Sequence, residues 1–295
     1  MSDNPDEIVR KAHSKLKPGF FSKMLSSKEG NLEEGIDLLV SAANIYKIQK
    51  NWKKAGEINE ELAMWDGKRG GKMAYAYYQE AAHCFSFVDK NRSSQSLDRA
   101  IESCEKVGKY MQAGKIAQRV ANELEENYNY EQAIIKYKKA AEFYEMESQN
   151  TKSMKQQCLL KVADLMCISN HKDMLKEAPK IYENLGKEYL TGSSLKFMAK
   201  ELFFKCVMIF IATKDEVSAE IALKKFILED PSFGDSKDCK FLQNAIKCIS
   251  EPPDVDGLKK EIQSYKNAEQ VDKWKLTMFG QTIKNFEHEN EEDLK

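Results

Sequence analysis

Hydrophobic residues recur at intervals of three and four positions along almost the whole of the 295-residue chain. In residues 32–49, for example, Ile36, Leu39, Ala43 and Tyr46 fall largely on one face of a helix. The alternation of apolar and polar residues that indicates a strand is absent, and only 6 prolines and 14 glycines interrupt the pattern. The sequence therefore predicts an all-α protein of about fourteen helices, each roughly 12–20 residues long.

The predicted breaks between helices share one layout: a polar turn residue, an aromatic residue and, one helical turn later, a small residue. The layout occurs at Asn51-Trp52-x-x-Ala55, at Lys109-Tyr110-x-x-Ala113 and at Asn129-Tyr130-x-x-Ala133. Trp52 and Tyr130 lie 78 residues apart, which is two steps of 39. A helix–turn–helix unit repeated about every 34–40 residues is typical of tetratricopeptide-like solenoids, in which each unit buries its apolar face against its neighbours.

Pairs of alanines followed by an aromatic residue indicate where paired helices pack closely. These pairs are Ala42-Ala43 before Tyr46, Ala81-Ala82 before Phe85, and Ala140-Ala141 before Phe143. The repeat pattern weakens after Asp230, where Pro231, Pro252 and Pro253 fall. We therefore predict a tetratricopeptide-like repeat domain over residues 1–230, a C-terminal helical bundle over residues 231–286 and an acidic tail over residues 287–295.

Residue patterns for catalysis or cofactor binding are not found in the sequence. The nearest approach to a phosphate-binding loop, Asp66-x4-Gly71-Lys72-Met73, lacks the first glycine and the final hydroxyl residue and lies between predicted helices. The 4 histidines are far apart, and the 7 cysteines include no CxxC pair, so we expect reduced core thiols rather than a metal site or a disulfide framework. The sequence predicts a protein that is not an enzyme and has no cofactor.

The amino-acid composition and net charge limit which kinds of partner the chain can attract. The chain is 42% hydrophobic and 32% charged with a net charge of -1, so it can bury a core but has no overall field that attracts nucleic acid. Its N-terminus lacks a basic and apolar leader, and no stretch approaches the roughly 20 apolar residues that cross a bilayer. We expect a soluble cytoplasmic protein that meets charged partners through local patches.

The segment of residues 18–27 carries two adjacent phenylalanines, Phe20 and Phe21, and the pair Met24-Leu25 in a predicted loop. One interpretation is that these side chains pack into the first repeat. The other is an exposed apolar tip that enters a membrane surface. Each buried Phe would then contribute roughly 1.5–3 kcal/mol, which gives weak and reversible attachment.

Two charged features also stand out. Lysines are scattered over the repeats, at positions 53, 54, 109, 115, 136, 138, 139, 152, 155 and 161. Such charges usually form a solvated face, but a subset lining one concave surface would suit an acidic, elongated partner. At the other end, residues 287–295 hold five acids and then Leu294, which is either a frayed end or a docking tip.

Six short strings, in this order and at this spacing, resemble the alpha-type soluble NSF attachment proteins over nearly the whole chain. They are Gly19-Phe-Phe-Ser22, Ala42-Ala-Asn-Ile-Tyr-Lys47 running into Lys50-Asn-Trp52, Gln157-Cys-Leu-Leu-Lys-Val-Ala163, Pro231-Ser-Phe-Gly-Asp-Ser-Lys-Asp-Cys-Lys240, Asp272-Lys-Trp274 and Glu291-Glu-Asp-Leu-Lys295.

The resemblance implies a fold and a function. Members of this family are twisted helical-repeat sheets with a C-terminal bundle, monomeric in solution. Several copies coat a four-helix SNARE bundle through a basic concave surface, and their C-terminal ends engage the NSF ATPase, which unwinds the bundle. By resemblance, the SNARE-binding residues are Lys109, Lys115 and Lys161; the NSF-binding residues are Asp215, Glu251, Glu291, Glu292, Asp293 and Leu294; and the membrane-contact residues are Phe20, Phe21, Met24 and Leu25.

The chain departs from the family pattern at three places, one of which is the Gly67–Gly71 turn, longer and more glycine-rich than expected. Gln157 stands where the family often has a further lysine, so Lys152 or Lys155 would have to supply that contact. Lys23 interrupts the apolar loop, and Met24-Leu25 is less bulky than the usual pair, which predicts weaker insertion into a membrane.

The alternative function is a tetratricopeptide-like scaffold of the co-chaperone type, which binds peptide tails in one short groove. That hypothesis does not explain the Phe20-Phe21 segment or Leu294 after the C-terminal acids. Titration with C-terminal peptides, set against titration with assembled SNARE complex, separates the two functions.

Overall fold

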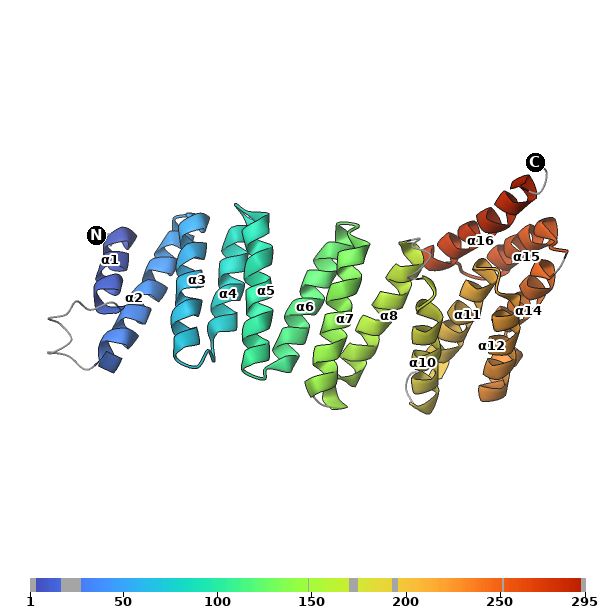
Figure 1. Ribbon diagram of the computed structural model, residues 1–295, viewed down its shortest axis with the longest axis horizontal. Helices are drawn as coiled ribbons and strands as arrows, with labels where there is room; N and C mark the ends of the chain where they lie inside the picture. The colour runs from blue at the N-terminus through green and yellow to red at the C-terminus, as the bar shows by residue number, and fades with distance from the viewer. Residues whose placement is uncertain are drawn as a thin grey trace. The chain divides into compact units, whose positions relative to one another are not determined.

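The computed structural model describes residues 4–16, 28–147, 149–169, 175–192, 196–250 and 252–292, and in these ranges it contains helices and turns but no strand. The predicted all-α helical repeat is therefore confirmed. The helices in chain order (Figure 1) are α1 (Pro5–Leu16), α2 (Lys28–Ile48), α3 (Trp52–Lys68), α4 (Ala74–Ser86), α5 (Lys90–Lys106), α6 (Tyr110–Glu126), α7 (Tyr130–Glu147), the short η2 (Gln149–Thr151), α8 (Lys152–Ile168), α10 (Ala178–Thr191), α11 (Lys196–Ala212), α12 (Glu216–Glu229), α13 (Pro231–Gly234), α14 (Lys237–Ile249), α15 (Val255–Ala268) and α16 (Lys273–Glu292).

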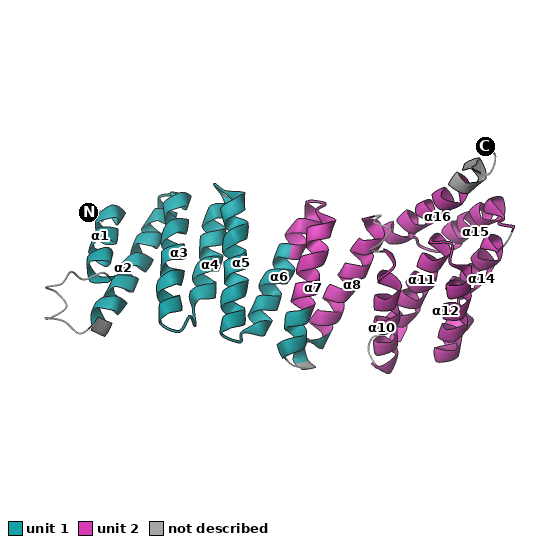
Figure 2. Ribbon diagram, viewed as in Figure 1, with its two compact units in different colours: residues 1–120, 142–152 teal, residues 121–141, 153–295 magenta. Residues whose placement is uncertain are grey.

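The chain forms two compact units (Figure 2). Unit 1 comprises residues 1–120 and 142–152, and unit 2 comprises residues 121–141 and 153–295. Helices α6 and α7 therefore contribute residues to both units. The predicted boundary at residue 230 lies inside unit 2 and stays a prediction.

Unit 1 is a row of helices in which each of α1 to α4 contacts the next along the chain (Figure 1). Small residues allow this close approach. The alanine pairs at 42–43 and 81–82 are buried, as the sequence predicts. Glycines come closer still: a Cβ on Gly56 of α3 would lie 2.6 Å from the ring of Phe85 in α4, and one on Gly114 would lie 2.7 Å from the ring of Tyr144. The helices thus pack glycine against aromatic ring.

The turns that join the helices repeat one backbone design. At four of them a residue with positive φ ends the helix: Lys50 (57°), Gly108 (70°), Tyr128 (60°) and Lys214 (61°). The next residue then donates its N–H to a carbonyl five residues back, as in Asn51 to Tyr46 at 2.8 Å and Asp215 to Phe210 at 2.9 Å. This is the 6→1 hydrogen bond of a Schellman motif, which ends a helix sharply and starts the next one.

Unit 2 adds contacts between helices far apart in the sequence. Helix α11 has 11 buried residues among its 17, and every residue from Leu202 to Ile209 is buried, as expected for a central segment that is largely apolar all round. It contacts α10 and α12, its neighbours in the chain, and also α14 and α16. Helix α16 continues to Glu292, so residues 287–292 of the predicted tail are helical. This return of α16 onto α11 gives the C-terminal region the character of a bundle.

The 7 cysteines are free thiols, and all except Cys248 are buried. Burial raises the pKa of Cys104 to about 11 and that of Cys158 to about 12. The thiolate is the reactive form of cysteine, so these side chains act as small apolar core residues, in agreement with the prediction from the sequence. No described helix has the length and apolar character needed to cross a membrane.

Candidate functional site

Two of the predicted SNARE-binding lysines lie in unit 1, at the start of α6. Lys109 precedes the helix; its Nζ donates to the carbonyl of Lys72 at 2.9 Å and lies 4.5 Å from the centroid of the Tyr75 ring. Lys115 lies on the exposed face of α6 and has no acidic partner among the described residues. The charge of Lys115 is therefore available to a partner, and Lys109 is held in place by its own unit.

Arg119 is a candidate that the sequence analysis missed. It follows Lys115 by four residues on α6, is exposed, and likewise has no ion pair within the described chain. Residues at i and i+4 lie on one helix face, and the neighbouring Ile116, Ala117 and Val120 are buried on the other face. The 3.6-residue period already visible in the sequence would have placed Arg119 beside Lys115.

The third predicted lysine, Lys161 of α8, lies in unit 2 and is paired. Its Nζ is 2.7 Å from Oε1 of Glu125, and the two side chains are 49% and 27% exposed. The other oxygen of Glu125 accepts a hydrogen bond of 2.7 Å from the hydroxyl of Tyr137. Burial, and then this carboxylate, hold the pKa of Tyr137 far above its usual range. Part of the positive charge of Lys161 is therefore neutralised within the chain.

Asp215, the first predicted NSF-binding acid, has a structural role. It is the N-cap of α12, where its Oδ1 accepts a hydrogen bond of 2.9 Å from the backbone N–H of Ser218. A carboxylate at this position also interacts favourably with the helix dipole. The side chain is exposed, so the same carboxylate can cap its helix and face a partner.

The remaining predicted site residues fall at the edge of the described structure or beyond it. Glu291 and Glu292 belong to the last turn of α16. Outside the described residues lie Glu251, Asp293, Leu294 and the membrane-contact residues Phe20, Phe21, Met24 and Leu25.

A buried polar cluster fixes the start of α16, the helix that leads to the C-terminal acids. Lys205 of α11 lies 2.9 Å from Oδ1 of Asp164 in α8, and the hydroxyl of Tyr182 in α10 donates to the same oxygen at 2.6 Å. Trp274 of α16 covers this cluster: its ring lies 5.1 Å from the Lys205 Nζ and packs at 90° against the Tyr182 ring. Burial disfavours the charged ammonium, but Asp164 outweighs burial and raises the pKa of Lys205.

Further along α16, two amide side chains reach backbone carbonyl groups of other helices. Gln281 donates to the carbonyl of Cys167 at 3.3 Å, and Asn285 donates to that of Ala212 at 2.9 Å. Helix α16 is thus held at its start by ring packing and along its length by hydrogen bonds. No local sequence pattern joins the members of this cluster, because they come from four different helices.

The described residues contain no group of histidine, cysteine, aspartate or glutamate placed to hold a metal ion. Unit 1 carries the exposed charges of Lys115 and Arg119 on α6, and unit 2 carries α16, the helix that leads to the C-terminal acids.

The sequence model of the family described as "Soluble NSF attachment protein, SNAP" matches residues 3–287. The alpha-soluble NSF attachment protein of Saccharomyces cerevisiae is 30% identical over 299 residues, covering 100% of both chains. The human protein of that name is 29% identical over 98% of this chain and 96% of its own length. The vesicular-fusion protein SEC17 of Komagataella phaffii is 29% identical over 95% of this chain and 94% of its own length. On this evidence the chain belongs to the soluble NSF attachment protein family.

Proposed function

We propose that this chain is an adaptor that binds assembled SNARE complexes and recruits and stimulates the NSF ATPase in vesicle fusion. The observation that carries the proposal is the family match over residues 3–287, with relatives named as NSF attachment and vesicular-fusion proteins covered over 94–100% of their length. ATP hydrolysis belongs to the partner, and the adaptor itself is not an enzyme. The alternative of a co-chaperone-type peptide scaffold is not favoured, because none of these relatives carries such a name.

Exposed lysines can bind an acidic SNARE bundle through its charge and its elongated shape. Each partly exposed ion pair contributes only about 0.2–1 kcal/mol, so recognition needs several contacts and tolerates different SNARE sequences. Several monomeric copies around one bundle add avidity without new contacts. The chain acts in the cytoplasm. Contact of the Phe20-Phe21 segment with a membrane adds a further weak attachment, which makes the association with membranes peripheral.

The direct test is NSF-dependent disassembly of a purified SNARE complex with ATP, in the presence and absence of this chain. We expect disassembly to require the chain, and the chain alone to hydrolyse no ATP. Lys115→Glu should abolish much of the binding, while Lys90→Glu, an equal charge change on the exposed surface of α5, should not. Disassembly at the same rate without the chain would refute the proposal.

The cap formed by Asp215 decides how its predicted role in NSF binding must be tested. Asp215→Ala removes the charge and also the cap, which costs about 1 kcal/mol of helix stability. Asp215→Asn removes the charge and keeps an oxygen that can accept the Ser218 N–H. Reduced NSF stimulation by Asp215→Asn, with unchanged SNARE affinity and unchanged melting, would support a direct contact; normal stimulation would reduce Asp215 to a structural residue.

A further inference from the structure

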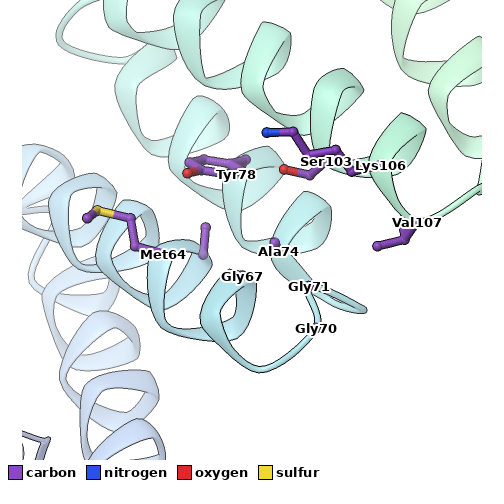
Figure 3. Close-up of a pocket in the computed structure, with 10 residues that line it drawn as sticks. Met64, Gly67, Gly70, Gly71, Ala74, Tyr78, Ser103, Lys106 and Val107 are labelled. Carbon is purple, nitrogen blue, oxygen red and sulfur yellow. The ribbon is translucent and has the colours of Figure 1, made fainter.

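A cavity of about 310 Å³ opens in unit 1 where the turn between α3 and α4 faces the end of α5 (Figure 3). Its lining is partly apolar and includes Met64 and Val107, with Gly67, Gly71 and Ala74 leaving space between them. A Cβ added to Gly67 would meet no atom within 4 Å. The missing side chain at Gly67 therefore helps to keep the cavity open.

Two polar side chains in this lining have no protein partner in the described chain: the hydroxyl of Tyr78 and the ammonium of Lys106 (Figure 3). Several buried tyrosines differ from Tyr78 in this respect. The hydroxyl groups of Tyr137, Tyr182 and Tyr265 each donate to a carboxylate of a neighbouring helix. Tyr78 thus offers a hydrogen-bond donor that its own chain does not use.

Lysines lie around the cavity. Besides Lys106, the two turns next to the cavity contribute Lys72 and Lys109, which are joined by the hydrogen bond from Lys109 to the Lys72 carbonyl. The nearby carboxylate of Asp66 is occupied, because it accepts a backbone hydrogen bond of 2.7 Å within its own turn. Glu102 and Glu105 of α5 are exposed and do not line the cavity. An anion in the cavity would therefore meet the donors of Tyr78 and Lys106, while the nearby acids Glu60, Glu102 and Asp66 lie outside the lining.

We infer that this cavity is a socket for one acidic side chain of the SNARE bundle. The carboxylate binds the Lys106 ammonium and the Tyr78 hydroxyl, and its methylene stem lies against Met64 and Val107. The inference rests on the proposed function, because the acidic, elongated partner comes from there. The apolar part of the lining favours a carboxylate on an aliphatic stem over a bare phosphate group. Lys109, a predicted SNARE-binding residue, follows Val107 by two positions, which joins the socket to the basic start of α6.

The test compares affinities of the full-length chain for a soluble four-helix SNARE bundle, measured by calorimetry. Lys106→Gln should weaken binding roughly 5–20-fold, the effect of losing one hydrogen-bonded charge contact. The matched control is Lys90→Gln, the same change elsewhere on α5, which should alter affinity less than about twofold. Tyr78→Phe should weaken binding by a smaller factor than Lys106→Gln, because it removes a neutral donor.

A second pair of variants tests the cavity itself without changing charge. Gly67→Leu fills the cavity and should weaken binding as Lys106→Gln does, whereas Gly67→Ala adds a methyl group that meets no atom and should bind like the wild type. Circular dichroism confirms that both variants fold. Acetylation of surface lysines, read by mass spectrometry, should show Lys106 but not Lys90 protected by the bound SNARE bundle.

The outcomes separate the socket from the function on which it rests. A wild-type chain that does not bind the SNARE bundle overturns the proposed function and the socket together. A wild-type chain that binds, with Lys106→Gln indistinguishable from Lys90→Gln, overturns the socket alone. Loss of binding to vesicles containing anionic lipid, with SNARE affinity retained, would assign the cavity to a lipid headgroup and also overturn the inference.

Discussion

The cluster beneath Trp274 allows a sharp prediction, because its two charges are buried unequally. The side chain of Lys205 is 6% exposed and that of Asp164 is 26% exposed, and their atoms lie 2.9 Å apart. Asp164→Asn removes the main counter-charge and leaves the ammonium in the core. Lys205→Met removes the ammonium and leaves the carboxylate with some solvent and with the hydroxyl of Tyr182. We therefore expect Asp164→Asn to destabilise the protein more.

The magnitudes follow from this geometry. Removing one partner of a fully buried ion pair costs about 3–5 kcal/mol. Partial exposure of Asp164, and the second acid Glu201 at 3.5 Å from the Lys205 Nζ, reduce the cost of Asp164→Asn to about 2–3 kcal/mol. Lys205→Met keeps a stem of similar volume against Trp274 and should cost only about 1 kcal/mol. The double variant should resemble Lys205→Met, which gives a coupling energy of about 2 kcal/mol.

Urea unfolding, followed by circular dichroism and by tryptophan fluorescence, measures these differences, and coincident transitions would justify two-state treatment of unit 2. If Lys205→Met lowers the free energy of unfolding as much as Asp164→Asn does, or if the two losses are additive, then the unpaired buried ammonium is not the cause of the destabilisation. The pH dependence gives a second check. Because the folded pKa of Lys205 is raised, the pair stabilises the fold below the unfolded pKa of about 10.4 and is lost as pH rises through the folded pKa.

Three further changes probe the surface and the packing. Glu125→Gln should strengthen SNARE binding about two- to fivefold by releasing Lys161, measured by calorimetry; weaker binding would show that the pair orients the lysine. Gly186→Ala should lower the free energy of unfolding by about 1–2 kcal/mol, because its Cβ would lie 2.5 Å from the packed ring of Phe203. The cost of this overpacking exceeds the gain in helix propensity from alanine. A rise in the urea midpoint of unfolding would contradict this expectation. Lys109→Asn should weaken SNARE binding without lowering the melting temperature, because asparagine is a better N-cap; a lower melting temperature would show that lysine is needed for the fold.

The sequence was sufficient for features that depend on local periodicity. The 3.6-residue pattern gives the helices, and the layout around Trp52, Tyr110 and Tyr130 gives the turns, because each is decided within a few residues. The burial of Ala55, Ala113 and Ala133, all 0% exposed, follows from the same layout. The run of apolar residues from Cys206 to Ala212 likewise agrees with the burial of this part of α11.

Features that join distant helices could not be predicted in the same way. Lys205 stands out as a lysine within an apolar helix, but its partner Asp164 is 41 residues away, and no local pattern identifies it. The cavity beside Gly67 likewise depends on where α5 ends relative to the α3–α4 turn. Charge alone was also misleading: Lys161 and Lys115 look equivalent in the sequence, and only the structure shows Glu125 beside Lys161.

The repeated turns differ in the residue that stands at the N-cap position of the following helix. Asn51 and Asp215 each follow a positive-φ residue and cap the next helix with a side-chain oxygen. Lys109 occupies the same position before α6, but an ammonium cannot accept a hydrogen bond. Glu147 of α7 supplies an acceptor instead, at 3.0 Å from the backbone nitrogen of Met111. The ammonium of Lys109 bonds the Lys72 carbonyl and lies over the Tyr75 ring, so this turn is held by contacts with neighbouring helices where the turns at Asn51 and Asp215 are held by a local cap.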